Sequence, residues 1–234
     1  MLDALAAGGE LGTNELARRL VLPPSTVSRQ LGTLASTGLV EHDPETGRYR
    51  LGIRIVRLAN AVLARLDVRS IARPHLEELV RITGETATLH VPGEDDAVTV
   101  DFVPSAHFVQ HVTQLGRPSI AHATSAGKVM LAFAGRPLPR GPLKTYTPRT
   151  ITGVKALAAE IERVRANGYA VAFEEREPGL NAVAAPIWSS TDALAAIVAL
   201  QGPTARFGRA QVVRATAPLL ARARAISLAL GWSP

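Results

Sequence analysis

The 234-residue sequence contains no cysteine, and this absence excludes several chemistries at the outset. Disulfide bonds, thiolate nucleophiles and cysteine-ligated zinc all require that side chain. No run of eighteen apolar residues is present either, and the opening letters MLDALAAGGE are too short and too acidic for a secretory signal. We therefore expect a cytoplasmic protein without a membrane segment.

Aromatic residues make up only 4% of the chain, and the formal charge of +6 includes no long run of lysine or arginine. A pI near 10.4 is compatible with a polyanionic partner, but arginine and alanine are also abundant in proteins of high-GC genomes. Charge alone therefore identifies no partner. Because 47% of the residues are hydrophobic, the chain can bury one sizeable core and a smaller second one, so we expect two domains.

Two groups of side chains are candidates for chemistry, and neither has the spacing that chemistry needs. Three histidines lack a third metal ligand at a suitable distance in the sequence; they are His107, His111 and His122. The run Glu174-Glu175-Arg176-Glu177 belongs to an expected strand, where adjacent side chains point to opposite faces, and no nucleophile lies nearby. We predict no metal, no cofactor and no enzymatic activity. The alternative is an enzyme whose N-terminal part only contacts other proteins.

The first fifty residues favour three short helices. An apolar stretch over residues 2–7 predicts the first, and Thr13 is a candidate N-cap of the second. Pro23 and Pro24 then interrupt the chain, because proline lacks an amide donor and suits only the first helical position. The third helix is expected over residues 25–36, so the spacing predicts a helix-turn-helix.

The third predicted helix has two different faces. Val27, Leu31 and Leu34 recur at helical spacing and predict an inner face. The outward residues are small, polar or cationic: Ser25, Thr26, Ser28, Arg29, Gln30 and Thr33. Such side chains suit the major groove of DNA, where arginine pairs with guanine and glutamine with adenine. An ordinary solvated face is the alternative.

A hairpin follows this helix. Residues 39–41 and 48–51 favour strands, and the letters DPETG at residues 43–47 favour the turn between them. A hairpin beside a groove-binding helix is a wing, and it would bring Arg48 and Arg50 to the DNA backbone or the minor groove. The alternative is ordinary surface structure.

The letters LPPSTVSRQLGTLASTGLVEHDPETGRYRLG resemble the DNA-binding domain of the isocitrate lyase regulator (IclR) family of bacterial transcription factors. Other winged-helix families share that pattern, so the C-terminal part decides between them. There GRPSIAHATSAGKVMLA, NGYAVAFEEREPGLNAVAAPI and ALQGPTARF resemble the effector domain of this family in content and order. The resemblance covers essentially the whole chain.

The resemblance implies an α+β protein with three parts: a winged helix-turn-helix over residues 1–52, a linker helix over 53–67 and a GAF-like effector-binding domain with an antiparallel sheet over 68–234. Amphipathic spacing over residues 53–66 agrees with the linker helix. In the family this helix packs against a second copy, which implies a homodimer, with a dimer of dimers left open. Residue patterns in the third part favour helices at 74–82, 155–167 and 209–230 and strands at 86–91, 97–103, 182–188 and 194–201.

The loop Thr124-Ser125-Ala126-Gly127 is the candidate ligand site. Its small residues enter an expected helix over residues 128–133 and leave backbone amides free, which favours an anion. The resemblance assigns effector binding to this loop, with Ser125 and Ala126 as donors and His122 beside them. Ser125 acting only as a helix cap is the alternative.

The resemblance places four further ligand-binding positions at Ala172, Ala182, Ala199 and Gln201. Three alanines predict a wide and weakly polar cavity, so we expect a larger aromatic or aliphatic acid rather than a very small hydrated one. The predicted function is a sequence-specific DNA-binding transcriptional regulator whose operator affinity is modulated by a small organic-acid or aromatic effector. We expect a repressor, although these residues do not distinguish repression from activation.

Overall fold

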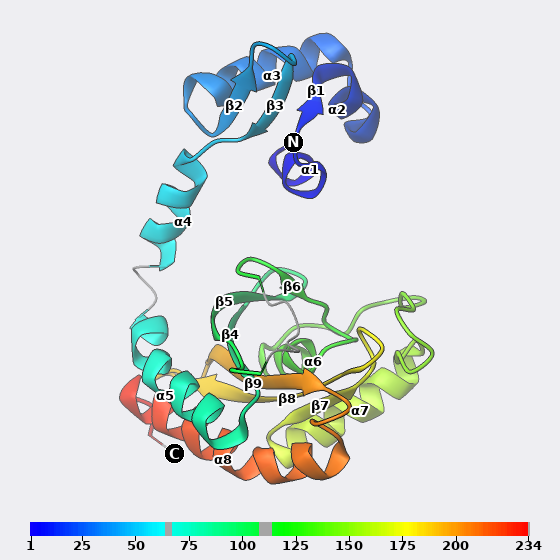
Figure 1. The fold of residues 1–234 in the computed structure, drawn as a ribbon. Helices are drawn as coiled ribbons and strands as arrows, with labels where there is room; N and C mark the ends of the chain where they lie inside the picture. Colours follow the sequence, from blue (N-terminus) through cyan, green and yellow to red (C-terminus); the bar gives the residue numbers. More distant parts are fainter. Residues whose placement is uncertain (64–66, 108–113, 234) are drawn as a thin grey trace. The chain divides into compact units, whose positions relative to one another are not determined.

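The computed structural model describes residues 1–63, 67–107 and 114–233 (Figure 1). His111 lies outside the described residues. The chain divides into two compact units, Met1–Arg65 and Leu66–Pro234, and each has its own core. In the described part of the chain, no helix is long and apolar enough to cross a membrane.

The first unit is a winged helix-turn-helix followed by one more helix. Its elements are α1 (Leu2–Gly8), β1 (Leu11–Gly12), α2 (Thr13–Leu20), α3 (Pro24–Ser36), β2 (Val40–Asp43), β3 (Arg48–Leu51) and α4 (Arg54–Leu63). The three strands form an antiparallel sheet in the order β1-β3-β2. Side chains from α1, α2, α3 and the sheet meet in one small core: Leu5, Leu11, Leu16, Ala17, Val27, Leu31 and Val40.

The turn between α2 and α3 is set by proline and by one unusual valine. Val21 ends α2 in the left-handed conformation at φ 54°, and Pro23 and Pro24 occupy the N-cap and the first position of α3. Proline at the first helical position removes only an amide that would lack a partner in any case. The prediction that Thr13 caps α2 is wrong, because Thr13 is the first residue of the helix and Gly12 precedes it.

The second unit is built on one antiparallel sheet. Its elements are α5 (Asp67–Thr83), β4 (Thr86–Pro92), β5 (Ala97–Val103), β6 (Pro118–Ser119), α6 (Ser125–Phe133), α7 (Val154–Asn167), β7 (Ala170–Phe173), β8 (Leu180–Trp188), β9 (Leu194–Pro203) and α8 (Arg209–Ala229). The strand order is β6-β5-β4-β9-β8-β7. Helices α5 and α8 pack together on one face of the sheet, and α6 packs on the other face with α7 beside it (Figure 1).

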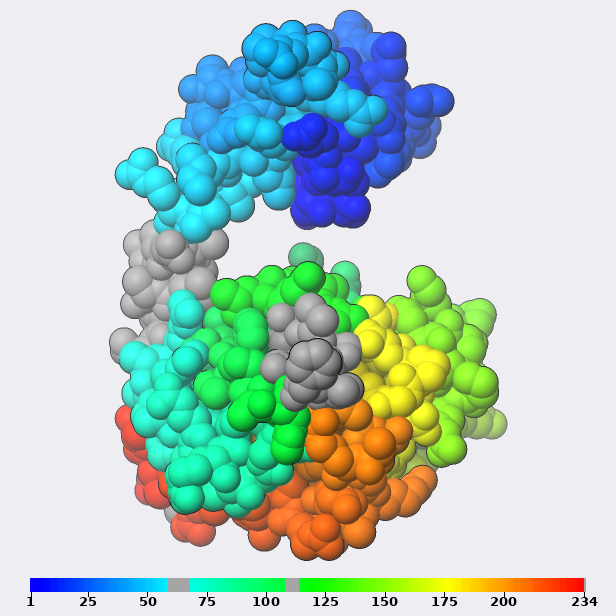
Figure 2. Space-filling model, viewed as in Figure 1, coloured from blue at the N-terminus to red at the C-terminus, as the bar shows by residue number. Residues whose placement is uncertain are grey.

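Two expectations for the second unit are corrected. Helix α5 begins at Asp67 rather than at Pro74, and Pro74 lies inside it, because a proline in a helix removes one backbone hydrogen bond without having to end the helix. The run Glu174–Glu177 is not part of a strand. It forms bends after β7, starting with Glu174 at φ 55°, and lies beside residues 147–150 (Figure 2, yellow beside lime green).

The ammonium group of Lys128 ties α6 to its surroundings. Lys128 is 1% exposed, and its Nζ donates to Glu175 Oε1 at 2.7 Å, to the Val171 carbonyl at 2.9 Å and to Glu160 Oε1 at 3.2 Å. Three protons thus meet three acceptors, which a buried ammonium needs. Burial raises the pKa of Glu175 despite this cation, whereas Lys128 and Arg163 outweigh burial at Glu160 and lower its pKa.

Both tryptophans of the chain lie at the C-terminal end of α8. The Trp188 amide donates to Ser227 Oγ at 2.9 Å, and the Trp232 amide donates to the Ser227 carbonyl at 3.0 Å. The Trp232 indole N–H donates to Asp192 Oδ1 at 2.8 Å, and Phe133 meets the Trp188 ring edge-on at 5.2 Å between centroids. The end of the sheet and the end of α8 are therefore joined by the Trp188 amide and by the Trp232 indole.

Substitution of Lys128 by Met should destabilise the protein by about 3–5 kcal/mol, because it leaves buried carboxylates without their cation. The loss should be larger at pH 8 than at pH 5. Burial already places the folded-state pKa of Glu175 above its ordinary value, so stability is gained as this group protonates and is lost as the pH rises. Urea unfolding at both pH values measures the effect. The control is Lys155→Met on the exposed face of α7, and equal losses in the two variants would contradict the role of Lys128.

Candidate functional site

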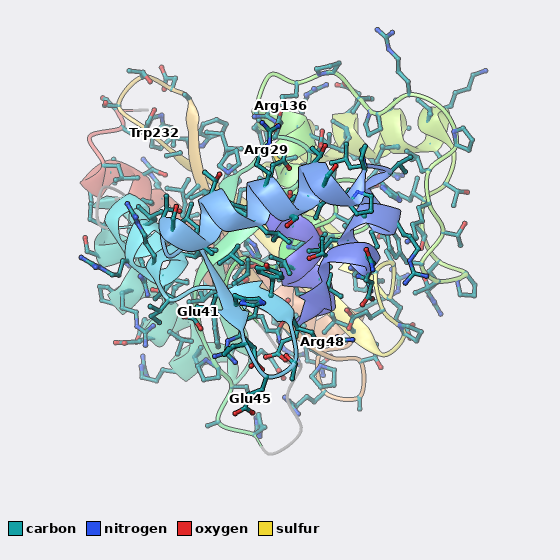
Figure 3. The ribbon with its side chains drawn as sticks, turned by 90° about the horizontal axis from the view of Figure 1, so that it is seen from above. Arg29, Glu41, Glu45, Arg48, Arg136 and Trp232 are labelled. Atoms are coloured by element: carbon teal, nitrogen blue, oxygen red, sulfur yellow. The ribbon has the colours of Figure 1, made fainter. Side chains whose placement is uncertain are left out.

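Helix α3 presents one polar face to solvent. Val27 and Leu31 are fully buried, while Ser25, Ser28, Arg29, Gln30 and Thr33 are exposed and Thr26 is half-buried. The separation follows from helical periodicity, which puts positions 27 and 31 on the same side. The predicted groove-facing residues therefore share one surface, and Figure 3 shows Arg29 on it.

Most polar groups on this face are available to a partner. Thr33 donates its hydroxyl proton to the Arg29 carbonyl at 3.2 Å. Ser25, Ser28, Arg29 and Gln30 make no side-chain hydrogen bond or ion pair with any residue that the structure describes. One cation and several neutral hydrogen-bonding groups thus stand unpaired on a rigid helix, which is what base-edge contacts require.

The two arginines of the wing are held by acidic side chains. Arg50 bonds Glu41 at 3.1 Å and Glu10 at 3.2 Å, and this hydrogen bond from Arg50 lowers the pKa of Glu41. Arg48 donates to the Glu10 carbonyl at 2.7 Å and approaches Glu15 to 4.0 Å. Figure 3 shows Glu41, Glu45 and Arg48 on the β2–β3 hairpin. The positive charge of the wing is therefore largely offset, which the sequence pattern did not reveal.

The start of α6 leaves two backbone amides unpaired. Thr124 is the N-cap, with φ −128° and ψ 153°, and its hydroxyl oxygen accepts from the Gly127 amide at 3.0 Å. The amides of Ser125 and Ala126 have no partner in the described part of the chain. The alternative that Ser125 caps the helix is wrong, and the helix starts at Ser125 rather than at residue 128.

Gly127 lets this helix begin close to the preceding loop. A Cβ atom at Gly127 would collide with the carbonyl oxygens of Ile120 and Ala121, which are backbone atoms and cannot easily move. Glycine therefore fixes how closely the first turn of α6 lies against residues 120 and 121. That contact holds the free amides in place.

The free amides face a cavity of about 70 Å³. Its lining comes from the start of α6, the sheet, the segment before β6 and the bends after β7: Thr88, His90, Thr99, Arg117, Pro118, Ser119, Ala123, Thr124, Ser125, Ala126, Ala172, Glu175, Arg176, Glu177, Leu180, Ala182, Ala199 and Gln201. Seven of the eight predicted ligand-binding residues are in this lining. Their role as ligand contacts stays a prediction.

Strand register brings the predicted positions together. Ala182 of β8 lies opposite Ala172 of β7 on one side and opposite Gln201 of β9 on the other. Ala199 of β9 lies opposite Thr88 of β4. Because residues two apart on a strand share a face, these side chains form one continuous floor beneath α6.

His122 is the predicted residue that the cavity does not include. Its Nε2 lies 2.9 Å from the Lys144 carbonyl oxygen, and its ring packs on Tyr146 at 5.8 Å between centroids. The side chain therefore faces the 140s segment rather than the ligand cavity. His122 is predicted to contact the ligand because it lies next to the loop in the sequence, but its side chain points toward Lys144 and Tyr146.

Sequence reasoning missed a polar wall. Thr88, His90, Thr99 and Ser119 line the cavity on the β4, β5 and β6 side. They make the cavity more polar than the alanines alone predict. The cavity is also small, whereas the alanines predict a wide one. The alternating hydroxyl and imidazole side chains in the letters TLHV and AVTV were the available signal, since they fall on one face of each strand.

Charged groups surround the same cavity. Arg117, which precedes β6, contacts Glu177 in the bends after β7, and Arg176 stacks on the Tyr146 ring at 4.3 Å. The Glu175 carboxylate is engaged by Lys128, and its carbonyl accepts from Thr150 at 2.6 Å. No cluster of three histidine or acidic side chains that could hold a metal occurs among the described residues.

Comparison with known proteins decides the family. The model of the bacterial transcriptional regulator IclR C-terminal domain matches residues 60–228, and the model of the IclR helix-turn-helix domain matches residues 1–44. The chain belongs to the IclR family. It is a DNA-binding transcriptional regulator, as the family is, and not an enzyme.

Named relatives agree over nearly the whole chain. The HTH-type transcriptional regulator BhcR of Paracoccus denitrificans is 33% identical over 98% of this chain and 84% of its own. The HTH-type transcriptional repressor AllR of Salmonella typhi is 28% identical over 97% of this chain and 86% of its own.

Solved structures match at the level of the whole chain. A putative IclR regulator from Silicibacter sp. TM1040 has a TM-score of 0.85 at 27% identity, covering 96% of this chain and 90% of its own. An IclR homologue from Microbacterium hydrocarbonoxydans, solved with 4-hydroxybenzoate, has a TM-score of 0.75 at 25% identity, covering 94% and 91%. The predicted α+β architecture with its N-terminal winged helix-turn-helix is confirmed.

Replacing Arg29 by Ala should weaken binding to the preferred operator by about 1–3 kcal/mol, or about 5- to 150-fold, because it removes an unpaired cation from the outer face of α3. Binding to random duplex should change much less. Fluorescence anisotropy with both duplexes, the operator being selected from genomic fragments, measures the two affinities. Arg214→Ala, an exposed arginine of α8, controls for the lost charge. Equal losses on both duplexes would assign Arg29 to phosphate contacts only.

Proposed function

We propose that this regulator is a cytoplasmic repressor that binds its operator through α3 and the wing and responds to a small carboxylic acid held in the cavity at the start of α6. One observation carries the choice of ligand: the amides of Ser125 and Ala126 are unpaired and face a cavity. Two adjacent amides at a helix N-terminus, where the helix dipole is positive, favour a carboxylate.

The volume of the cavity limits the acid. One water position needs about 10–15 Å³ on the same scale, so about 70 Å³ holds about five to seven such positions. A cavity of this volume suits a compact acid better than a long one. The relative solved with 4-hydroxybenzoate supports an acid as the class of ligand. A compact aliphatic acid is the form we favour, and an aromatic acid belongs in the same screen.

The DNA contacts follow from the exposed face of α3. We assign base contacts to Arg29 and Gln30, with the hydroxyl residues Ser25, Ser28 and Thr33 at the backbone or at neighbouring bases. Arg48 and Arg50 reach phosphates only if DNA competes with Glu10 and Glu41, so their contribution should be smaller than that of free cations. The sign of regulation rests on the relatives that are named repressors.

A homodimer is the assembly we favour. Ile53, just before α4, is 70% exposed, and Val56 and Leu58 of α4 are 51% and 49% exposed. Apolar side chains on one short helix remain in water in a single chain, and a second copy of the same helix would bury them. A dimer presents two α3 helices to two half-sites, which must lie about 34 Å apart, so an effector that alters their separation alters operator affinity.

Substitution of Ser125 by Pro tests the carboxylate site. Thr124 already has the extended conformation that precedes proline, and Ser125 is the first helical residue, where proline is tolerated. The variant loses the Ser125 amide and hydroxyl, whereas Ser125→Ala loses only the hydroxyl. In a thermal-shift screen, small carboxylates should stabilise the wild type, and Ser125→Ala should keep most of that stabilisation. The Pro variant should lose it. Retention in all three proteins would place the acid elsewhere.

Substitution of Val56 by Glu tests the dimer. A carboxylate buried between two copies of α4 should shift the protein to monomers and reduce operator affinity, because single half-site binding replaces cooperative binding. Light scattering after gel filtration gives the mass. Val213→Glu introduces the same change at a 72% exposed valine of α8 and should leave both properties unchanged. Dimers that persist in Val56→Glu at low concentration would rule out this helix as the interface.

A further inference from the structure

His90 sits at the centre of the polar wall of the cavity. The side chain is 4% exposed, and its Nε2 lies 2.8 Å from Thr88 Oγ1. Its Nδ1 lies 3.2 Å from both Thr99 Oγ1 and Ser119 Oγ. The imidazole thus contacts three hydroxyl groups, all of which line the same cavity.

The wall carries no charge. Burial lowers the pKa of His90 to about 4, so the ring is neutral at physiological pH. The strands beside it bring only uncharged side chains to the lining, Thr99 from β5 and Ala199 and Gln201 from β9. The charged lining groups lie on other segments, where Glu175 is bound to Lys128, Arg117 contacts Glu177 and Arg176 stacks on Tyr146.

The floor of the cavity therefore has two unlike halves. On β4 and β5 it is neutral and hydrogen-bonding, and on β9, β8 and β7 it is formed by the small apolar side chains of Ala199, Ala182 and Ala172, with Gln201 as the polar residue of that half. The carboxylate-binding amides belong to α6, above this floor. An acid that also carries an uncharged polar group can bond the amides of α6 through its carboxylate and the neutral wall through that polar group. A second carboxylate would be buried against neutral groups, which costs much free energy.

We propose that His90, with Thr88, Thr99 and Ser119, selects a hydroxyl group on the effector, so that the ligand is a compact hydroxy acid rather than a plain acid or a dicarboxylic acid. This inference rests on the proposed carboxylate site. Both ring nitrogens are engaged by these hydroxyl groups, and an effector hydroxyl, which can donate and accept, fits the side-chain hydroxyls whichever nitrogen of the imidazole carries the proton. His90 is thereby a specificity-determining residue that the sequence comparison did not indicate.

Matched acids separate the two halves of the proposal. Isothermal titration with 3-hydroxypropanoate, propanoate and malonate varies only the group at one end, and 4-hydroxybenzoate with benzoate repeats the comparison on a ring. In each series that binds, the wild type should bind the hydroxylated acid about tenfold more tightly than the plain acid. His90→Leu should bring this ratio close to one, because the imidazole that holds the three hydroxyl groups is lost. His90→Gln, which keeps a neutral donor and acceptor, should preserve most of the preference.

The pH dependence of the affinity gives a second readout, which reports whether His90 stays neutral when the acid is bound. Affinity for 3-hydroxypropanoate should be constant between pH 6 and pH 8, because neither the carboxylate nor His90 titrates there. The contrary result is that malonate binds more tightly than 3-hydroxypropanoate and that the affinity for malonate rises about tenfold for each unit by which the pH falls. His90 would then take up a proton on binding, and the proposal would be wrong. A preference for hydroxyl groups that survives in His90→Leu would also overturn it.

Failure of this inference is distinguishable from failure of the proposed function. Binding of the acids without any preference for a hydroxyl group would contradict the role of His90 alone. Absence of binding by every acid in the series would sink the carboxylate site and the inference with it. Thermal melting of His90→Leu and His90→Gln shows whether each variant is folded, and the pH test is made on the unsubstituted protein, with His90→Gln as the control that has no imidazole to protonate.

Discussion

The close approach of α6 to the loop before it is the contact on which the ligand site depends. It exists because Gly127 has no side chain to strike the carbonyl oxygens of Ile120 and Ala121. Thr124 then satisfies the third amide of the helix and leaves the first two for a ligand. Lys128, one turn further on, anchors the same helix to the bends after β7 through Glu175. Gly127, the Thr124 cap and the buried Lys128 ammonium thus all fix the position of the first turn of α6.

The polar side chains of this cavity come from a different part of the chain than its unpaired amides do. The amides depend on local structure, whereas the neutral wall depends on the antiparallel pairing of β4 with β5 and β9. A sheet floor can change its side chains without moving the helix above it. Members of one fold can therefore keep a carboxylate site and vary what they recognise at the other end of the ligand.

Local patterns predicted much of this structure. Proline at positions 23 and 24, the spacing of Val27 and Leu31 and the turn letters at 43–47 are short-range signals, and the winged helix-turn-helix followed from them. The predicted ligand positions Ala172, Ala182 and Gln201 share one face because strand register carried them there. Long-range pairing was not readable. His122 faces Lys144, and the wing arginines face Glu10, through contacts that no local spacing encodes, whereas the pair of Glu41 and Arg50 follows from the hairpin register.

The placement of both tryptophans gives the molecule an optical property. Trp188 and Trp232 are fastened to Ser227 and Asp192 at the end of α8, and neither lines the ligand cavity. Intrinsic indole emission is therefore insensitive to direct quenching by a bound acid. Any change in emission when the cavity is filled reports movement transmitted through β8, through α8 or through Phe133 of α6, so the native chain carries its own probe of long-range coupling.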